Sequence, residues 1–289
     1  MRFSAFLAAA ILFVGCAKHS GSYAVAESQG TAEQSQTLQA EADAAWASRG
    51  DGAQLKLALM KYAAALGADA GNRHAAVRLT RGYYWYGDVH ETTKEGKLAA
   101  WNTAVKWGAR CMAINAEFTQ ILEKGGETEA TATAKAMKVE DVPCIYWTAS
   151  ALGKWAKLTG FTTLLKHKDT VKSYIETVQR LDPDFSYNAP DRYFGAYYSI
   201  APSFAGGDLG KSKKHFDISI AGSPGYLATK VLYAQYYATK MQDADLFETL
   251  LNEVITADPA AIVEITPENK AEQVKAQHLL NTKADYFAN

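Results

Sequence analysis

Residues 171–183 read VKSYIETVQRLDP, and the same pattern returns in SKKHFDISIAGSP (212–224) and FETLLNEVITADP (247–259). In each stretch the first, fifth and eighth residues fall on one face of a helix, one turn apart. The proline five residues later lacks an N–H and clashes with the preceding turn, so it ends the helix. The repeated positions are Val171, Ile175 and Val178; Ser212, Phe216 and Ser219; and Phe247, Leu251 and Val254. The stretch from 171 to 259 therefore predicts three helices of one design.

Two weaker copies of this pattern lie upstream and lack the proline. They are Ala58, Tyr62 and Ala65 before Ala70, and Ala104, Gly108 and Cys111 before Ala116. The intervals between repeat ends are irregular, and the last comes nearest to the roughly 34 residues of a tetratricopeptide repeat. We predict an all-α, tetratricopeptide-like helical repeat array with degenerate repeats. An insertion from Glu123 to Val142 and a C-terminal capping helix from Thr266-Pro267 complete it.

Composition limits the class of protein and of partner. The chain has 289 residues, 48% of them hydrophobic, and a net charge of −1. This length supports one large or two small domains. The near-neutral balance argues against a nucleic-acid partner, which requires a clustered basic face.

The N-terminus has the pattern of a secretory signal. Arg2 precedes an apolar run, Ala5–Val14, which is too short to span a bilayer and ends at Gly15-Cys16. The small residue before a cysteine resembles a bacterial lipobox, although Phe13 replaces the usual leucine. That resemblance implies a diacylglyceryl group on Cys16, and Ala17 implies sorting to the outer membrane. The alternative is ordinary cleavage that leaves the cysteine unmodified.

The domain prediction follows from these features. We expect a lipoprotein signal peptide at 1–15, a lipid anchor and flexible tether at 16–36, and the helical domain at 37–289. The tether is rich in Ser, Gly, Gln and Ala and has almost no large apolar residue.

Several local features of the helical domain can be predicted. Gly50–Gly52 should turn the first hairpin, Gly87-Asp88 should stop a helix, and Asp169 is a plausible N-cap for the Val171 helix. The apolar segment 144–158 should form a central helix. Cys111 and Cys144 could pair in an oxidising compartment, but separately buried thiols are favoured because Cys111 occupies a small core position.

No motif in the sequence supports catalysis. Gly206–Ser212 ends like a phosphate-binding loop, but Ala205 stands where the pattern needs glycine and no strand precedes it. The six histidines lack metal-ligand spacing, and no nucleophile motif is present. We therefore predict no enzyme activity, no cofactor and no metal site.

The chain has sixteen tyrosines, many on the first helices of the repeats. Such helices commonly line the concave surface of a helical array. The candidate ligand- or partner-binding residues of this aromatic groove are Tyr146, Trp147, Trp155, Tyr197, Tyr198, Tyr233 and Tyr237. The alternative is that most of them pack between helices. A groove role predicts that Tyr198→Ala or Tyr237→Ala weakens binding more than stability.

Two runs of the sequence carry a family resemblance. They are YFGAYY (193–198) with AGGD (205–208) and KHF (214–216), and LYAQYY (232–237) with DLF (245–247) and ADP (257–259). Together they resemble the T-component of tripartite ATP-independent periplasmic (TRAP) transporters, and the match covers most of the mature chain. Ser212 and Ser219 replace the alanines more usual in that repeat helix.

The resemblance implies a periplasm-facing lipoprotein of tetratricopeptide-like helices that forms a homotrimer. Members of the family have cavities or pores through each protomer, partner the TRAP substrate-binding protein and are not enzymes. The implied ligand is a small organic acid or another apolar molecule. The alternative function is a generic repeat lipoprotein that organises envelope protein assembly.

Overall fold

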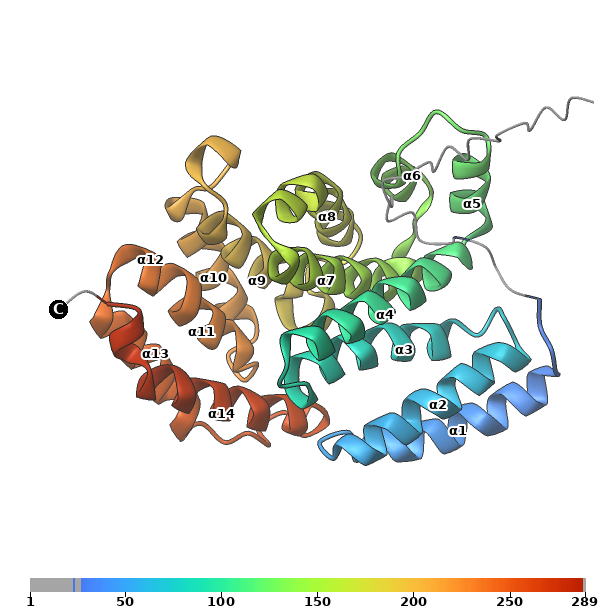
Figure 1. The fold of residues 1–289 in the computed structure, drawn as a ribbon, viewed down its shortest axis with the longest axis horizontal. Coiled ribbons are helices and arrows are strands. Elements are labelled where there is room, and N and C mark those ends of the chain that lie inside the picture. Colours follow the sequence, from blue (N-terminus) through green and yellow to red (C-terminus); the bar gives the residue numbers. More distant parts are fainter. Residues whose placement is uncertain (1–22, 24–26, 288–289) are drawn as a thin grey trace, which may run out of the picture.

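The computed structural model describes residues 23 and 27–287, and every regular element in them is a helix (Figure 1). The α-helices are α1 Ala32–Ala47, α2 Gly52–Ala68, α3 Arg73–Trp85, α4 Lys94–Ala113, α5 Ala116–Glu123, α6 Glu129–Ala136, α7 Val142–Thr159, α8 Phe161–Leu181, α9 Phe185–Ile200, α10 Leu209–Gly222, α11 Ala228–Leu232, α12 Thr239–Met241, α13 Ala244–Thr256 and α14 Thr266–Asn281. Two π-helical turns, η1 Tyr86–His90 and η4 Tyr233–Ala238, and four 3₁₀ turns, η2 Val139–Asp141, η3 Ser203–Ala205, η5 Val263–Ile265 and η6 Lys283–Asp285, complete the list. The all-α prediction is confirmed.

The repeated pattern marks the second helix of successive hairpins. Helices α8, α10 and α13 end just before Pro183, Pro224 and Pro259, and all nine repeated positions are buried. The weaker copies lie in α2 and α4. Neighbouring helices pack as pairs: α1 with α2, α3 with α4, α7 with α8, α9 with α10, and the α11–η4 segment with α13. The helical array is confirmed, while its assignment to the tetratricopeptide class stays a prediction.

Two apolar cores lie within this array. The N-terminal core joins side chains from α1 to α9 around large buried residues such as Tyr62, Phe118 and Tyr174. The C-terminal core runs from α10 to α14 around Phe216 and Phe247. As predicted, α7 is central, and it packs against α3, α4 and α8.

Cys111 of α4 and Cys144 of α7 form a disulfide, with 5.5 Å between their Cα atoms. The prediction of separately buried thiols was wrong. Both cysteines do occupy buried core positions, as expected. Because α4 and α7 pack side by side, these two core positions meet.

Two local predictions also change. Asp169 lies within α8, which begins eight residues earlier at Phe161, so it does not cap this helix. Gly87-Asp88 do not stop the helix, because they continue it through η1. The predicted insertion from Glu123 to Val142 carries the short helix α6 and the 3₁₀ turn η2.

The chain preceding α1 contacts the domain. Thr31 and Gln34 form a reciprocal capping box, so α1 starts at Ala32, inside the range predicted as tether. The Gln29 N–H donates to the Gly67 carbonyl (2.9 Å), and Ser28 Oγ accepts from the Ala70 N–H (3.0 Å). The signal peptide and Cys16 lie outside the described residues.

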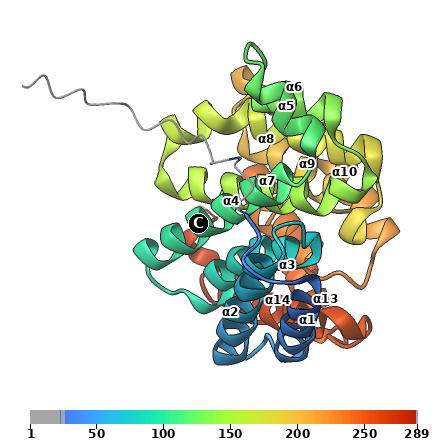
Figure 2. The ribbon, with the colours of Figure 1, turned by 90° about the vertical axis from the view of Figure 1, so that its right-hand side faces the viewer.

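Helix α14 lies end to end with the α1–α2 hairpin (Figure 1). Figures 1 and 2 both place α14 along the same edge of the molecule as α1 and α2. An ion pair joins them where they meet, because Arg49 in the α1–α2 turn pairs with Glu268 of α14. Within the described residues, no helix combines the length and apolar character that crossing a membrane requires.

Candidate ligand cleft

A cleft of about 780 Å³ opens between the two halves of the array. Its walls come from α3, the start of α7, the start of α9, the end of α10 and η5. The lining residues are His74, Val77, Arg78, Arg81, Pro143, Trp147, Asp184, Phe185, Ser186, Tyr187, Asn188, Gly222, Ser223 and Glu264. This volume is in the range of small-molecule sites.

Helix α3 gives the cleft a cationic wall. His74, Arg78 and Arg81 are spaced by four and three residues, so they share one face of the helix. His74 pairs with Asp43 at 2.8 Å, and Arg81 pairs with Glu268 at 2.9 Å.

Arg78 is the cation of this wall that lacks a close anion among the described residues. Its guanidinium lies 4.7 Å from the centre of the Trp46 ring, and Asp43 attracts it from beyond ion-pair distance. Burial and the neighbouring Arg81 charge lower the pKa of Arg78 below its ordinary value. An anion bound beside it would relieve that repulsion.

The opposite wall is a strained turn at the start of α9. Ser186, Tyr187 and Asn188 have φ of 47°, 64° and 56°, the left-handed region that side chains other than glycine rarely adopt. Each such residue costs on the order of 1–3 kcal/mol. The buried Arg192 stabilises the turn, since its Nη1 donates to the Tyr187 carbonyl (2.8 Å) and its Nη2 to the Ser186 carbonyl (3.2 Å).

Aromatic rings form the apolar part of the cleft. Trp147 lines it directly, and Tyr146 packs edge-on behind it with 5.0 Å between ring centres. Phe185 lies 5.4 Å from Tyr146, and Tyr187 stacks on Tyr226 at 5.1 Å. A ligand in the cleft therefore meets aromatic faces as well as Arg78.

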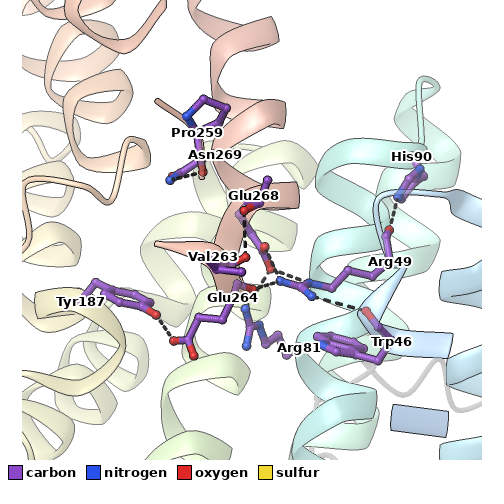
Figure 3. Close-up of polar contacts among 11 residues, drawn as sticks. Trp46, Arg49, Arg81, His90, Tyr187, Pro259, Val263, Glu264, Glu268 and Asn269 are labelled. Atoms are coloured by element: carbon purple, nitrogen blue, oxygen red, sulfur yellow. Dashed lines mark hydrogen bonds and ion pairs between the residues drawn. The ribbon is translucent and has the colours of Figure 1, made fainter. Parts of the chain in front are cut away.

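A group of charged residues, the terminal clasp of Arg49, Arg81 and Glu268, closes one edge of the cleft (Figure 3). Arg49 donates through Nε to Glu268 Oε1 (2.9 Å) and through Nη2 to Oε2 (2.6 Å). It also donates to the carbonyl of Glu264, whose side chain accepts from the Tyr187 hydroxyl. Burial alone would raise the pKa of Glu268, but Arg49 and Arg81 outweigh it and lower that pKa.

A second ion cluster binds α14 to the same half of the molecule. Asp88 of η1 accepts from Lys154 of α7 and from Lys275 of α14, the latter at 2.5 Å. Burial would raise the pKa of Asp88, yet the two ammonium groups hold it well below its usual range. Ionic contacts thus join α14 to both η1 and the α1–α2 turn.

The sequence matches the model of a known protein family. The model of the TRAP transporter T-component family matches residues 41–287. The chain belongs to this family. No curated protein matches it. Membership makes the chain a component of a TRAP transport system.

The aromatic residues predicted to line one groove in this T-component lie on α7, α9 and η4, and their binding role stays a prediction. Trp147 lies in the cleft and Tyr146 directly behind it. Trp155 is at the far end of α7, beside His167. Tyr197 and Tyr198 are half-buried on α9, where Tyr198 stacks against His215.

The two remaining candidates are in the C-terminal core. Tyr233 stacks on Phe216 with 4.7 Å between ring centres, and Tyr237 packs edge-on to Tyr233. Both rings are buried. This placement favours the packing role for Tyr237, so that Tyr237→Ala would lower stability by about 3 kcal/mol.

Sequence reasoning missed the charged and strained residues of the cleft. A cationic stripe at 74, 78 and 81 was visible at helical spacing and could have been noticed. The left-handed turn had no signal, because Ser186 and Tyr187 are not residues that favour this backbone. In the described part of the chain, no group of three or more His, Cys, Asp or Glu side chains could hold a metal ion.

Proposed function

We propose that this T-component is a periplasm-facing lipoprotein, anchored in the outer membrane through Cys16, that docks the substrate-binding protein of its TRAP system. It works as a homotrimer and holds a small organic ligand in the cleft between its two halves. The family match supports the transport role. The signal sequence ending at Cys16 supports the anchor.

The pairing of Arg78 with an aromatic wall carries the ligand part of the proposal. An organic molecule with an apolar body and one anionic group would place its body against Trp147 and its anion at the Arg78 guanidinium. A hydrogen-bonded charge pair of this kind adds roughly 1.5–3 kcal/mol. The neighbouring Arg81 and His74 already have carboxylate partners, Glu268 and Asp43, so Arg78 sets the position of the anion.

The docking role is tested by mass in solution. The chain from Ala17 onward, without lipid, is measured by light scattering alone and mixed with the substrate-binding protein of its TRAP system. We expect three times the monomer mass alone, and a further gain with the partner. A monomer that ignores the partner would overturn the docking role and favour the generic envelope scaffold.

The ligand role predicts that Arg78→Gln lowers the affinity for ligand but has little effect on stability. We expect its affinity for a small aromatic carboxylate, measured by calorimetry, to fall about tenfold or more, equivalent to about 1.4 kcal/mol. The unfolding free energy should change by less than about 1 kcal/mol, since Arg78 makes a cation–π contact but no close ion pair. Lys240→Gln, which removes an exposed charge from α12, is the control and should leave affinity unchanged. Equal affinities of Arg78→Gln and the parent chain would remove Arg78 from the site.

A further inference from the structure

Tyr23 lies only seven residues after Cys16, yet it is inserted into the folded domain. Its ring meets the ring of Phe118 edge-on, with 5.2 Å between centres. Its hydroxyl reaches Tyr174 and Glu129, and Tyr174 donates to Glu129. Burial, reinforced by Tyr174 and Glu129, raises the pKa of Tyr23 above its usual range.

The residues that receive Tyr23 come from three helices. Phe118 lies on α5, Glu129 on α6 and Tyr174 on α8. Phe118 and Tyr174 are fully buried, so they form a fixed surface rather than a mobile one. The following chain is held as well, at Ser28 and Gln29, by backbone groups at the end of α2.

These contacts lie at one end of the molecule. Figure 1 is drawn with the longest axis horizontal, and it places α5 and α6 at the right-hand end and α12 and α13 at the left-hand end. Figure 2, seen from the right, has α5 and α6 toward the viewer. Seven residues span at most about 25 Å even when fully extended. Lipidation of Cys16 would therefore hold the backbone of Tyr23 within about this distance of the anchoring residue.

We infer that Tyr23 orients the anchored domain, so that the α5–α6 end faces the phospholipid surface and the α12–α13 end projects into the aqueous space. This inference rests on the proposed lipidation of Cys16. A free tether would let the domain rotate through all orientations. Docking at Tyr23 keeps α12 and α13 away from lipid, where a soluble partner can reach them.

Energy transfer to the bilayer tests the orientation. The lipidated chain is inserted into phosphatidylethanolamine–phosphatidylglycerol vesicles whose headgroups carry an acceptor dye. A donor dye is attached to the chain at one of two positions, Lys124→Cys beside α5 or Lys240→Cys in α12. Both lysines are exposed, and the native Cys111–Cys144 disulfide leaves the introduced cysteine as the thiol to label. We expect at least twofold greater transfer from position 124 than from position 240. Adding Tyr23→Ala should at least halve this difference, whereas Tyr23→Phe, which keeps the ring on Phe118, should preserve most of it.

Two outcomes would overturn the inference: equal transfer from the two positions in the parent chain, or a difference that Tyr23→Ala leaves intact. Melting of each variant verifies that the domain is folded.

Mass spectrometry of Cys16 separates failure of the proposed anchor from failure of the orientation. If Cys16 carries no lipid, hydrogen exchange in the soluble chain still decides whether Tyr23 docks. If Tyr23 docks, peptides that span residue 23 should exchange their amide hydrogens faster in Tyr23→Ala than in Tyr23→Phe. Equal exchange in the two variants would overturn docking.

Discussion

Replacing Glu268 by alanine is expected to lower the unfolding free energy by about 3–5 kcal/mol, the usual cost of removing one partner of a buried ion pair. The Glu268 side chain is 11% exposed and that of Arg49 is 6% exposed. Without Glu268, two guanidinium groups, those of Arg49 and Arg81, lose their carboxylate while they remain largely out of water. Urea unfolding followed by circular dichroism gives the free energy.

Glu176→Ala is the matched control. Glu176 pairs with Lys172 one turn away on an exposed face of α8, and such pairs contribute about 0.3–0.5 kcal/mol. If Glu268→Ala costs no more than Glu176→Ala, the clasp does not hold α14 against the α1–α2 turn.

The same clasp gives stability a defined pH dependence. The pKa of Glu268 is lowered in the folded protein from its ordinary 4.5, so the unfolded chain takes up this proton first as the pH falls. The contribution of Glu268 is complete above pH 4.5 and is lost as the pH falls through the lower folded value. We therefore expect the stability gap between the parent chain and Glu268→Ala to be constant near neutral pH and to shrink below pH 4.5. A gap that widens on acidification would contradict this assignment.

Loss of the Cys111–Cys144 disulfide is expected to lower the unfolding free energy by about 3–4 kcal/mol. The crosslink joins positions separated by 33 residues, so its loss restores considerable freedom to the unfolded chain. Urea unfolding of the chain with both cysteines changed to alanine measures the effect.

The two single variants serve as controls for this crosslink. Cys111→Ala and Cys144→Ala should each cost nearly as much as the double variant, because either change breaks the same bond. Clearly additive single effects would indicate instead that the two side chains contribute only through separate packing.

Much of the fold could be predicted because helices are encoded by near neighbours in the sequence. The spacing of Val171, Ile175 and Val178 sets one buried face, and Pro183 ends the helix, whatever the rest of the chain does. The runs around Tyr193–Tyr198 and Leu232–Tyr237 were specific enough to indicate the family. Asp169 shows the limit of such local reasoning, since a good capping residue lies within a helix when a longer helix packs better.

Local sequence patterns were enough to predict the all-α class, the repeated buried faces and the family to which this protein belongs. The disulfide, the terminal clasp, the contacts of Tyr23 and the cleft around Arg78 became visible only in the folded chain. Arg49 and Glu268 are 219 residues apart, and no periodicity relates them. Which of several similar hairpins meet depends on packing over the whole chain, whereas each helix depends on contacts three and four residues away.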